Sequence, residues 1–160
     1  MTGAYSADAE TSNPAEKEGE YPVDLILQAT RDMFGKEASR LGIVLRVDQS
    51  DRKTNVPALA LIRAVSNLVA NALHHAKAST VSVNVSGNEP FSIVVSDDGV
   101  GLAENELARL KSRGAKGEDS SGEGLGLAIV QDLARRHGFD LTLKSQLGKG
   151  TTARLQLPSS

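Results

Sequence analysis

Apolar residues recur at every third or fourth position in three stretches of the chain, which is the spacing of a helix with one buried face. Gly42 and Gly138 directly follow two of these stretches, and glycine commonly terminates a helix. A fourth, shorter helix is expected after the second glycine turn, followed by a polar, glycine-rich segment without cap residues. The predicted bounds are 23–41, 57–76 and 122–137 for the long helices, 104–110 for the short helix and 112–121 for a mobile loop.

Other stretches alternate apolar and polar residues with a period of two, which predicts strands with one buried face. Gly87 and Asn88 separate two such runs and predict a hairpin, and Gly148 to Gly150 form the turn between two closing strands. Helices combined with antiparallel hairpins favour an α+β fold, a two-layer α/β sandwich whose mixed, mostly antiparallel sheet carries helices on one face. The predicted strands cover residues 43–47, 81–85, 91–95, 141–143 and 153–157.

Composition adds the domain boundaries and excludes several classes of site. Residues 1–20 are small, polar and acidic, so they are expected to be a disordered leader or linker, with one domain over residues 21–160. A net charge of -2 gives no electrostatic reason to expect nucleic acid or anionic membrane as a partner. The chain has no cysteine, which excludes disulfides and thiolate metal sites, and no apolar run long enough to cross a bilayer.

Four polar side chains share one face of the 57–76 helix, opposite its apolar stripe. These are Asn67, Asn71, His74 and His75. A solvated face is one explanation; the alternative is that an amide oxygen coordinates Mg²⁺, which prefers oxygen ligands and shares its shell with phosphates and water. A zinc site on the paired histidines is disfavoured, because adjacent helical positions diverge and no further ligand stands at the usual spacing.

Two glycine-rich segments follow, and each alone is weak evidence for a site. Asp97 ends an apolar strand before Gly99 and Gly101, where it forms a simple Asp-Gly turn or accepts a hydrogen bond from the exocyclic amine of a base such as adenine. The segment 122–127 opens a helix, and free N–H groups at a helix N-terminus bind phosphate. It is neither a dinucleotide-binding fingerprint nor a P-loop, since no βαβ unit surrounds it and no Gly-Lys-Ser/Thr follows.

The order of these segments resembles one superfamily of ATPases. The segments SNLVANALHHA, VVSDDGVGL, GEGLGLAIV and GKGTTARLQLP follow one another as in the ATP-binding (Bergerat) fold of gyrase, the large heat-shock chaperone, MutL and histidine kinases. The histidine-kinase branch is the most similar. The resemblance covers roughly residues 22–158 and implies the ATP-binding catalytic domain of a bacterial two-component sensor histidine kinase.

This resemblance implies roles for the residues of the Asn-bearing helix. Asn71 would be the Mg²⁺ ligand, and Asn67 would support it near the phosphates of ATP. His74 stands where many such kinases have Lys or Arg, so it would be a weaker, pH-dependent phosphate contact in catalysis. His75 would lie against the nucleotide.

The glycine segments and the closing hairpin would complete the ATP site. Asp97 would hold the adenine amine, and residues 102–121 would form an ATP lid. Arg113 and Lys116 in that lid either contact the γ-phosphate or face water. The remaining contacts would shape the adenine pocket or cradle the phosphates through the backbone, at Gly99, Gly101, Gly122, Gly124, Leu125, Gly126, Leu127 and Thr151.

Asn67 also bears on the reaction. Relatives that hydrolyse ATP have a Glu at this position, and asparagine cannot act as a general base, which favours transfer of the γ-phosphate to a protein acceptor. The expected acceptor is a histidine on a phosphoacceptor domain of the same parent protein or of a partner kinase, with a response regulator downstream. The expected location is the cytoplasm, including the cytoplasmic portion of a longer membrane-bound sensor. A serine kinase of the anti-sigma-factor type and a non-catalytic ATP-sensing module are the alternatives.

Overall fold

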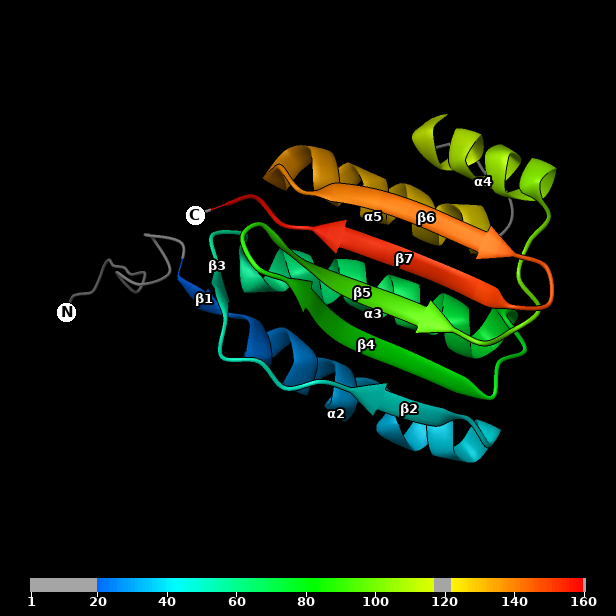
Figure 1. Ribbon diagram of the computed structural model, residues 1–160, viewed down its shortest axis with the longest axis horizontal. Helices are drawn as coiled ribbons and strands as arrows, with labels where there is room; N and C mark the ends of the chain where they lie inside the picture. Colours follow the sequence, from blue (N-terminus) through cyan, green and yellow to red (C-terminus); the bar gives the residue numbers. More distant parts are fainter. Residues whose placement is uncertain (1–19, 117–121, 160) are drawn as a thin grey trace.

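The computed structural model describes residues 20–116 and 122–159, which form two layers (Figure 1). One layer is a five-stranded sheet, and three helices cover one of its faces. In sheet order the strands are β2 (Val44–Val47), β4 (Thr80–Gly87), β5 (Phe91–Asp97), β7 (Gly150–Gln156) and β6 (Asp140–Gln146). The covering helices are α2 (Val23–Leu41), α3 (Ala58–His75) and α5 (Gly122–His137). The predicted two-layer α+β sandwich is therefore confirmed.

The core lies between the layers because alternate strand residues point toward the helices. Strand β5 is central, and its inward residues pair in register with inward residues on both neighbours: Val95 lies opposite Val83 and Ala153. Ile93 and Leu155 form the next pair, and both are fully buried. Only β2 runs parallel to its neighbour among the pairs of this sheet, so the sheet is mixed but mostly antiparallel.

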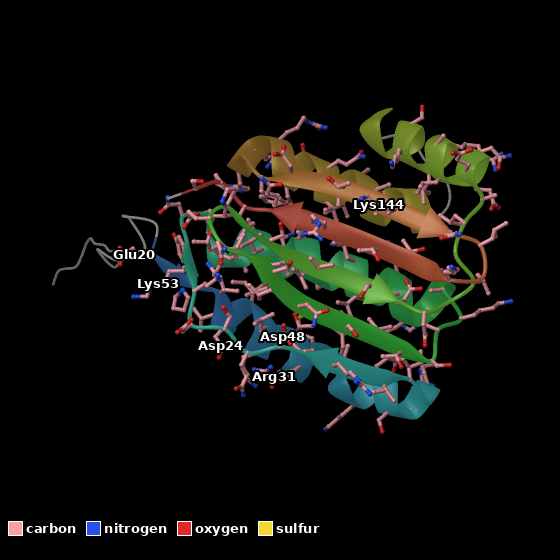
Figure 2. All side chains as sticks on the ribbon, viewed as in Figure 1. Glu20, Asp24, Arg31, Asp48, Lys53 and Lys144 are labelled. Carbon is pink, nitrogen blue, oxygen red and sulfur yellow. The ribbon has the colours of Figure 1, made fainter. Side chains whose placement is uncertain are left out.

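Helix α2 is terminated by a glycine and anchored by hydrogen bonds to the segment that follows β2. Gly42 adopts φ +74°, a conformation that glycine tolerates, and its N–H bonds to the carbonyls of Ala38 and Ser39. Nearer the start of the helix, Arg31 donates to the carbonyl of Asp48 (3.0 Å), and Asp24 accepts the Ser50 N–H (3.2 Å). Figure 2 shows Asp24, Arg31 and Asp48 together beside the segment that follows β2. These bonds hold the edge strand against the helix layer.

Two elements differ from the sequence-based expectation. The polar segment after β2 contains β3 (Lys53–Thr54), which pairs with β1 (Tyr21–Pro22) to form a two-residue ladder too short to show a period. Helix α4 (Glu104–Lys116) continues into the expected mobile loop, whose residues 117–121 lie outside the described part. Leu107 and Leu110 of this helix pack against the core. The expected leader, except for Glu20, also lies outside the described residues. Within residues 20–116 and 122–159, no helix combines the length and apolar composition needed to span a membrane.

Asp98, just after β5, joins the end of that strand to the segment leading into β4. One carboxylate oxygen accepts the N–H groups of Ser79 (2.7 Å) and Thr80 (2.9 Å). These two backbone hydrogen bonds, with the Thr80 bond the larger cause, hold the pKa of Asp98 below its ordinary value. The ionised carboxylate therefore stabilises the folded state at any pH above the pKa in the unfolded chain, and this contribution is lost as the pH falls through the folded-state pKa.

Asp98→Asn is expected to unfold at a lower temperature than the wild type at neutral pH, because the amide keeps an acceptor oxygen but loses the charge. The difference should shrink below about pH 4 and vanish once the wild-type carboxyl is protonated. Thermal unfolding followed by circular dichroism over a pH series measures both. An equal difference at neutral and strongly acidic pH would contradict the electrostatic cause.

Candidate functional site

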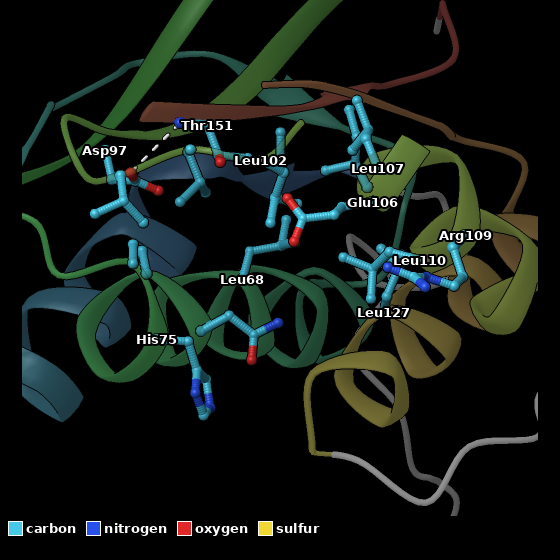
Figure 3. Close-up of a pocket in the computed structure, with 18 residues that line it drawn as sticks. Leu68, His75, Asp97, Leu102, Glu106, Leu107, Arg109, Leu110, Leu127 and Thr151 are labelled. Atoms are coloured by element: carbon cyan, nitrogen blue, oxygen red, sulfur yellow. Dashed lines mark hydrogen bonds between the residues drawn. The ribbon is translucent and has the colours of Figure 1, made fainter. Parts of the chain in front are cut away.

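A pocket of about 240 Å³ lies at the end of the sheet where β5 finishes, between α3 and α4 (Figure 3). Its wall is mostly apolar, with a few polar groups at separate points. That pattern is typical of small-molecule sites, although the volume is below the roughly 300–1,000 Å³ of most ligand pockets. The pocket therefore encloses only part of a nucleotide-sized ligand. The polar or small site residues predicted from the sequence that line it are Asn71, His75, Asp97, Gly101 and Thr151, with Leu127 on the apolar wall.

Asp97 is the last residue of β5 and stands at one end of this pocket. Its Oδ1 accepts the N–H of Gly99 (2.8 Å) and, at 3.4 Å, that of Thr151 on β7 (Figure 3). Burial raises the pKa of Asp97 above its ordinary value, the two N–H groups oppose this, and the negative charge of Asp98 adds to it. The result is a fixed, partly desolvated carboxylate, which is a strong acceptor for a ligand N–H group.

The glycines around Asp97 are required by contacts between backbones. A Cβ on Gly99 would stand 2.0 Å from the carbonyl oxygen of Ala76, at the end of α3. A Cβ on Gly150 would stand 2.0 Å from the carbonyl oxygen of Asp97 itself. From the sequence, Gly99 is expected to shape the adenine pocket, and that role stays a prediction. The structure shows that Gly99 lets the turn approach the end of α3.

Asn71 and His75 face the pocket from α3, one helical turn apart. Asn67 and His74, expected on the same face, are not among the described residues that line it. Successive α-helical residues are rotated by about 100°, so Asn67 and His74 lie toward the far edge of this face. The Asn67 amide donates to the Arg63 carbonyl of its own helix at 2.8 Å.

His74 points instead toward α2. Its Nε2 lies 3.6 Å from Oε2 of Glu37, which also pairs with Arg40 at 2.7 Å. The hydrogen bond from Arg40 is the main cause that lowers the pKa of Glu37, and the charge of His74 contributes less. The structure therefore places the His74 side chain outside the pocket, and its expected contact with a phosphate stays a prediction.

The apolar wall was not predicted from the sequence. The start of the expected lid and α4 close one side of the pocket, and Figure 3 shows Leu102, Leu107 and Leu110 facing Leu68 of α3 across it. The spacing of Leu107 and Leu110, three residues apart, was a usable signal that one face of this helix is apolar. Two charged residues of α4, Glu106 and Arg109, also line the pocket, and Oε1 of Glu106 accepts the Ala103 N–H at 2.9 Å.

The second glycine segment forms the first turn of α5, which begins at Gly122 as expected. The first four N–H groups of a helix lack partners within the helix. Leu127, the last residue of this segment, lines the pocket. The structure does not describe the side chains of Arg113, Lys116 and Leu125, or the burial of Gly122, Gly124 and Gly126. Their predicted roles remain predictions.

Comparison with known proteins gives one family for most of the chain. Residues 57–160 match the family described as histidine kinase-, DNA gyrase B-, and HSP90-like ATPase. The histidine protein kinase DivJ of Caulobacter vibrioides is 32% identical over 140 residues, covering 82% of this chain and 24% of the relative. The sensor histidine kinase RppB of Synechocystis is 36% identical over 105 residues, covering 61% of this chain and 23% of the relative. This chain thus spans about a quarter of the length of these relatives.

Solved structures agree in fold. The ATP-binding domain of PrrB from Mycobacterium tuberculosis superposes with a TM-score of 0.67 at 25% identity, covering 88% of this chain and 96% of that one. Full-length ShkA, solved in complex with AMPPNP, gives a TM-score of 0.72 at 22% identity, covering 88% of this chain and 31% of that one.

Gly99→Ala is expected to lower the free energy of unfolding by about 1–3 kcal/mol, since the added methyl group meets backbone that must shift. The matched control is Gly35→Ala in α2, where a Cβ meets nothing within 4 Å. That change should raise the free energy of unfolding by about 0.5–1 kcal/mol through the better helix propensity of alanine. Urea titration measures both, and a tolerated Gly99→Ala would contradict the close backbone packing.

Asp97→Asn is expected to be more stable than the wild type at neutral pH. Because the folded-state pKa is raised, the ionised carboxylate opposes folding above that pKa, whereas the neutral amide still offers an oxygen to Gly99 and Thr151. The gain should disappear as the pH falls below the unfolded-state value of about 3.9, where the wild-type carboxyl is also neutral. Thermal unfolding across pH tests this, and a variant that is less stable at neutral pH refutes it.

Proposed function

Because the chain belongs to the family of histidine kinase-, DNA gyrase B- and HSP90-like ATPases, we propose that it is the ATP-binding catalytic domain of a sensor histidine kinase. It binds ATP with Mg²⁺ and donates the γ-phosphate to a histidine of a phosphoacceptor domain. The observation that carries the proposal is the fixed Asp97 carboxylate at one end of an apolar pocket, with Asn71 on the facing helix.

The apolar slot and Asp97 suit an adenine base. A flat aromatic base gains from burial between aliphatic walls such as Leu68, Leu107 and Leu110. The Asp97 carboxylate accepts the exocyclic amine, and its orientation is set in advance by the Gly99 and Thr151 N–H groups. A carboxylate at this point also rejects bases that present a carbonyl there, because two acceptors would face each other.

The triphosphate extends beyond this small pocket toward Asn71 and the first turn of α5. Among the described residues, no group of three or more His, Asp or Glu side chains is placed to hold a metal ion. One amide oxygen, from Asn71, fits Mg²⁺ that is otherwise held by phosphates and water. When bound, Mg²⁺ supplies positive charge against the phosphate oxygens, and the free N–H groups at the start of α5 supply further positive potential.

Transfer of the γ-phosphate is favoured over hydrolysis of ATP, because residue 67, where relatives that hydrolyse ATP have a Glu, is not a general base that could activate water. The Asn67 amide cannot take a proton, and its Nδ2 is engaged by the Arg63 carbonyl. The chain's residues thus bind and orient ATP, while a histidine ring nitrogen attacks the γ-phosphorus in line and ADP leaves. We place that histidine on a phosphoacceptor domain of the parent protein or of a partner kinase. A response regulator then receives the phosphate, and this domain acts in the cytoplasm, within a soluble kinase or a membrane-bound sensor.

The test combines ATP titration with phosphoryl transfer to an added phosphoacceptor hairpin domain of a sensor histidine kinase. Asn71→Ala should reduce transfer to background because a Mg²⁺ ligand is lost. Asp97→Asn should weaken ATP binding roughly ten- to hundredfold, through the loss of a charge-assisted hydrogen bond. Calorimetry and labelled γ-phosphate measure the two effects.

Asn88→Ala, on the exposed β4–β5 turn, is the matched control and should behave as the wild type. The product should be acid-labile, as phosphohistidine is. Unchanged transfer by Asn71→Ala, or an acid-stable phosphate, would overturn the assignment.

A further inference from the structure

The hydroxyl of Ser145 on β6 joins two walls of the pocket without lining it. Its Oγ accepts the N–H of Leu102 at 2.8 Å, lies 2.8 Å from Oγ1 of Thr151, and stands 3.2 Å from the carbonyl oxygen of Gly150. Leu102 and Thr151 both line the pocket, and Figure 3 shows them on the same side of it. We propose that Ser145 is a positioning residue that couples nucleotide contact at Thr151 to the placement of Leu102 and α4. This inference rests on the proposed ATP site.

The coupling follows from the number of hydrogen bonds that one hydroxyl can make. A serine hydroxyl donates one proton and accepts two. Leu102 uses one acceptor position, so the single proton of Ser145 goes either to the Gly150 carbonyl or to Thr151 Oγ1. When the Thr151 hydroxyl donates to a nucleotide or to its bound water, the Ser145–Thr151 hydrogen bond is kept only if Ser145 donates its proton to Thr151. The bonds from the Leu102 N–H through Ser145 to Thr151 then form a continuous chain, and such chains strengthen each member.

Leu102 is the residue at which this coupling reaches α4. It lies two residues before Glu104, the first residue of the helix, and its side chain is part of the apolar wall. The segment has a second anchor, because the Val100 carbonyl accepts the Gly148 N–H at 2.8 Å through backbone atoms alone. Loss of the Ser145 hydroxyl therefore releases Leu102 but leaves Val100 attached, so the effect is local to the start of α4.

A suitable control exists at the far end of the domain. The Ser50 hydroxyl also accepts one backbone N–H, that of Arg52 at 3.1 Å, and is part-buried. Ser50→Ala removes a comparable hydrogen bond far from the pocket. If lower stability alone changed the response to ATP, Ser50→Ala would change it as well, whereas a loss of coupling should appear only in Ser145→Ala.

The experiment measures amide hydrogen exchange and ATP affinity on the whole chain with Mg²⁺ and ATP. In the wild type, ATP should slow exchange in residues 102–112. In Ser145→Ala this slowing should be lost, and ATP affinity should fall roughly two- to tenfold, the effect of about one hydrogen bond. Ser145→Thr keeps the hydroxyl and should restore both, and Ser50→Ala should respond to ATP as the wild type does.

A double-mutant cycle separates the relay from simple support of the loop. In a Thr151→Val background, Ser145→Ala should weaken ATP binding by clearly less than it does alone, because the relay is already broken. Full additivity, or a wild-type ATP response in Ser145→Ala, overturns the coupling while the ATP site stands. Failure of the wild type to bind ATP overturns the proposed function and this inference together.

Discussion

The close packing of backbone around Asp97 is the constraint on which the site depends. The turn after β5 lies against the end of α3 so tightly that a Cβ on Gly99 would overlap the Ala76 carbonyl, and β7 approaches Asp97 equally closely at Gly150. This packing brings the Gly99 and Thr151 N–H groups to one carboxylate oxygen. The orientation of Asp97 is therefore a property of three backbone segments, and only glycine permits their approach.

Adjacent aspartates in this turn experience opposite environments. Asp98 is exposed and accepts two short backbone hydrogen bonds, which lower its pKa, while burial raises the pKa of Asp97. The Asp98 carboxylate contributes to the stability of the folded state, and the Asp97 carboxylate opposes it. A group that costs stability and lies in a pocket is typical of a functional position, because the cost is recovered when a ligand supplies the missing hydrogen-bond donor.

Helix α4 gives the site a wall that is held by its leucines and by its entry segment. Its leucines pack on the core, and its entry is held by the Ser145 and Gly148 contacts with Leu102 and Val100. Such an arrangement allows a covering segment to respond to the ligand without disturbing the sheet. In the proposed ATP site, this pocket would enclose only the base, and the phosphates would extend toward α3 and α5.

The sequence by itself determined the three long helices, the strands of the five-stranded sheet, their order along the chain, the family and the position of Asp97 at a strand end. These features depend on local periodicity and on short motifs, which can be recognised without knowledge of the packing. Only the tertiary structure decided which side chains of the Asn-bearing helix face the pocket, because contacts with α2, α5 and the sheet set the rotation of α3 about its axis. Asn71 and His75 were thereby brought to the site, while His74 was turned toward Glu37. The sequence also did not show the close packing at Gly99, the apolar wall or the Ser145 contacts. Each of these features joins residues that are distant along the chain.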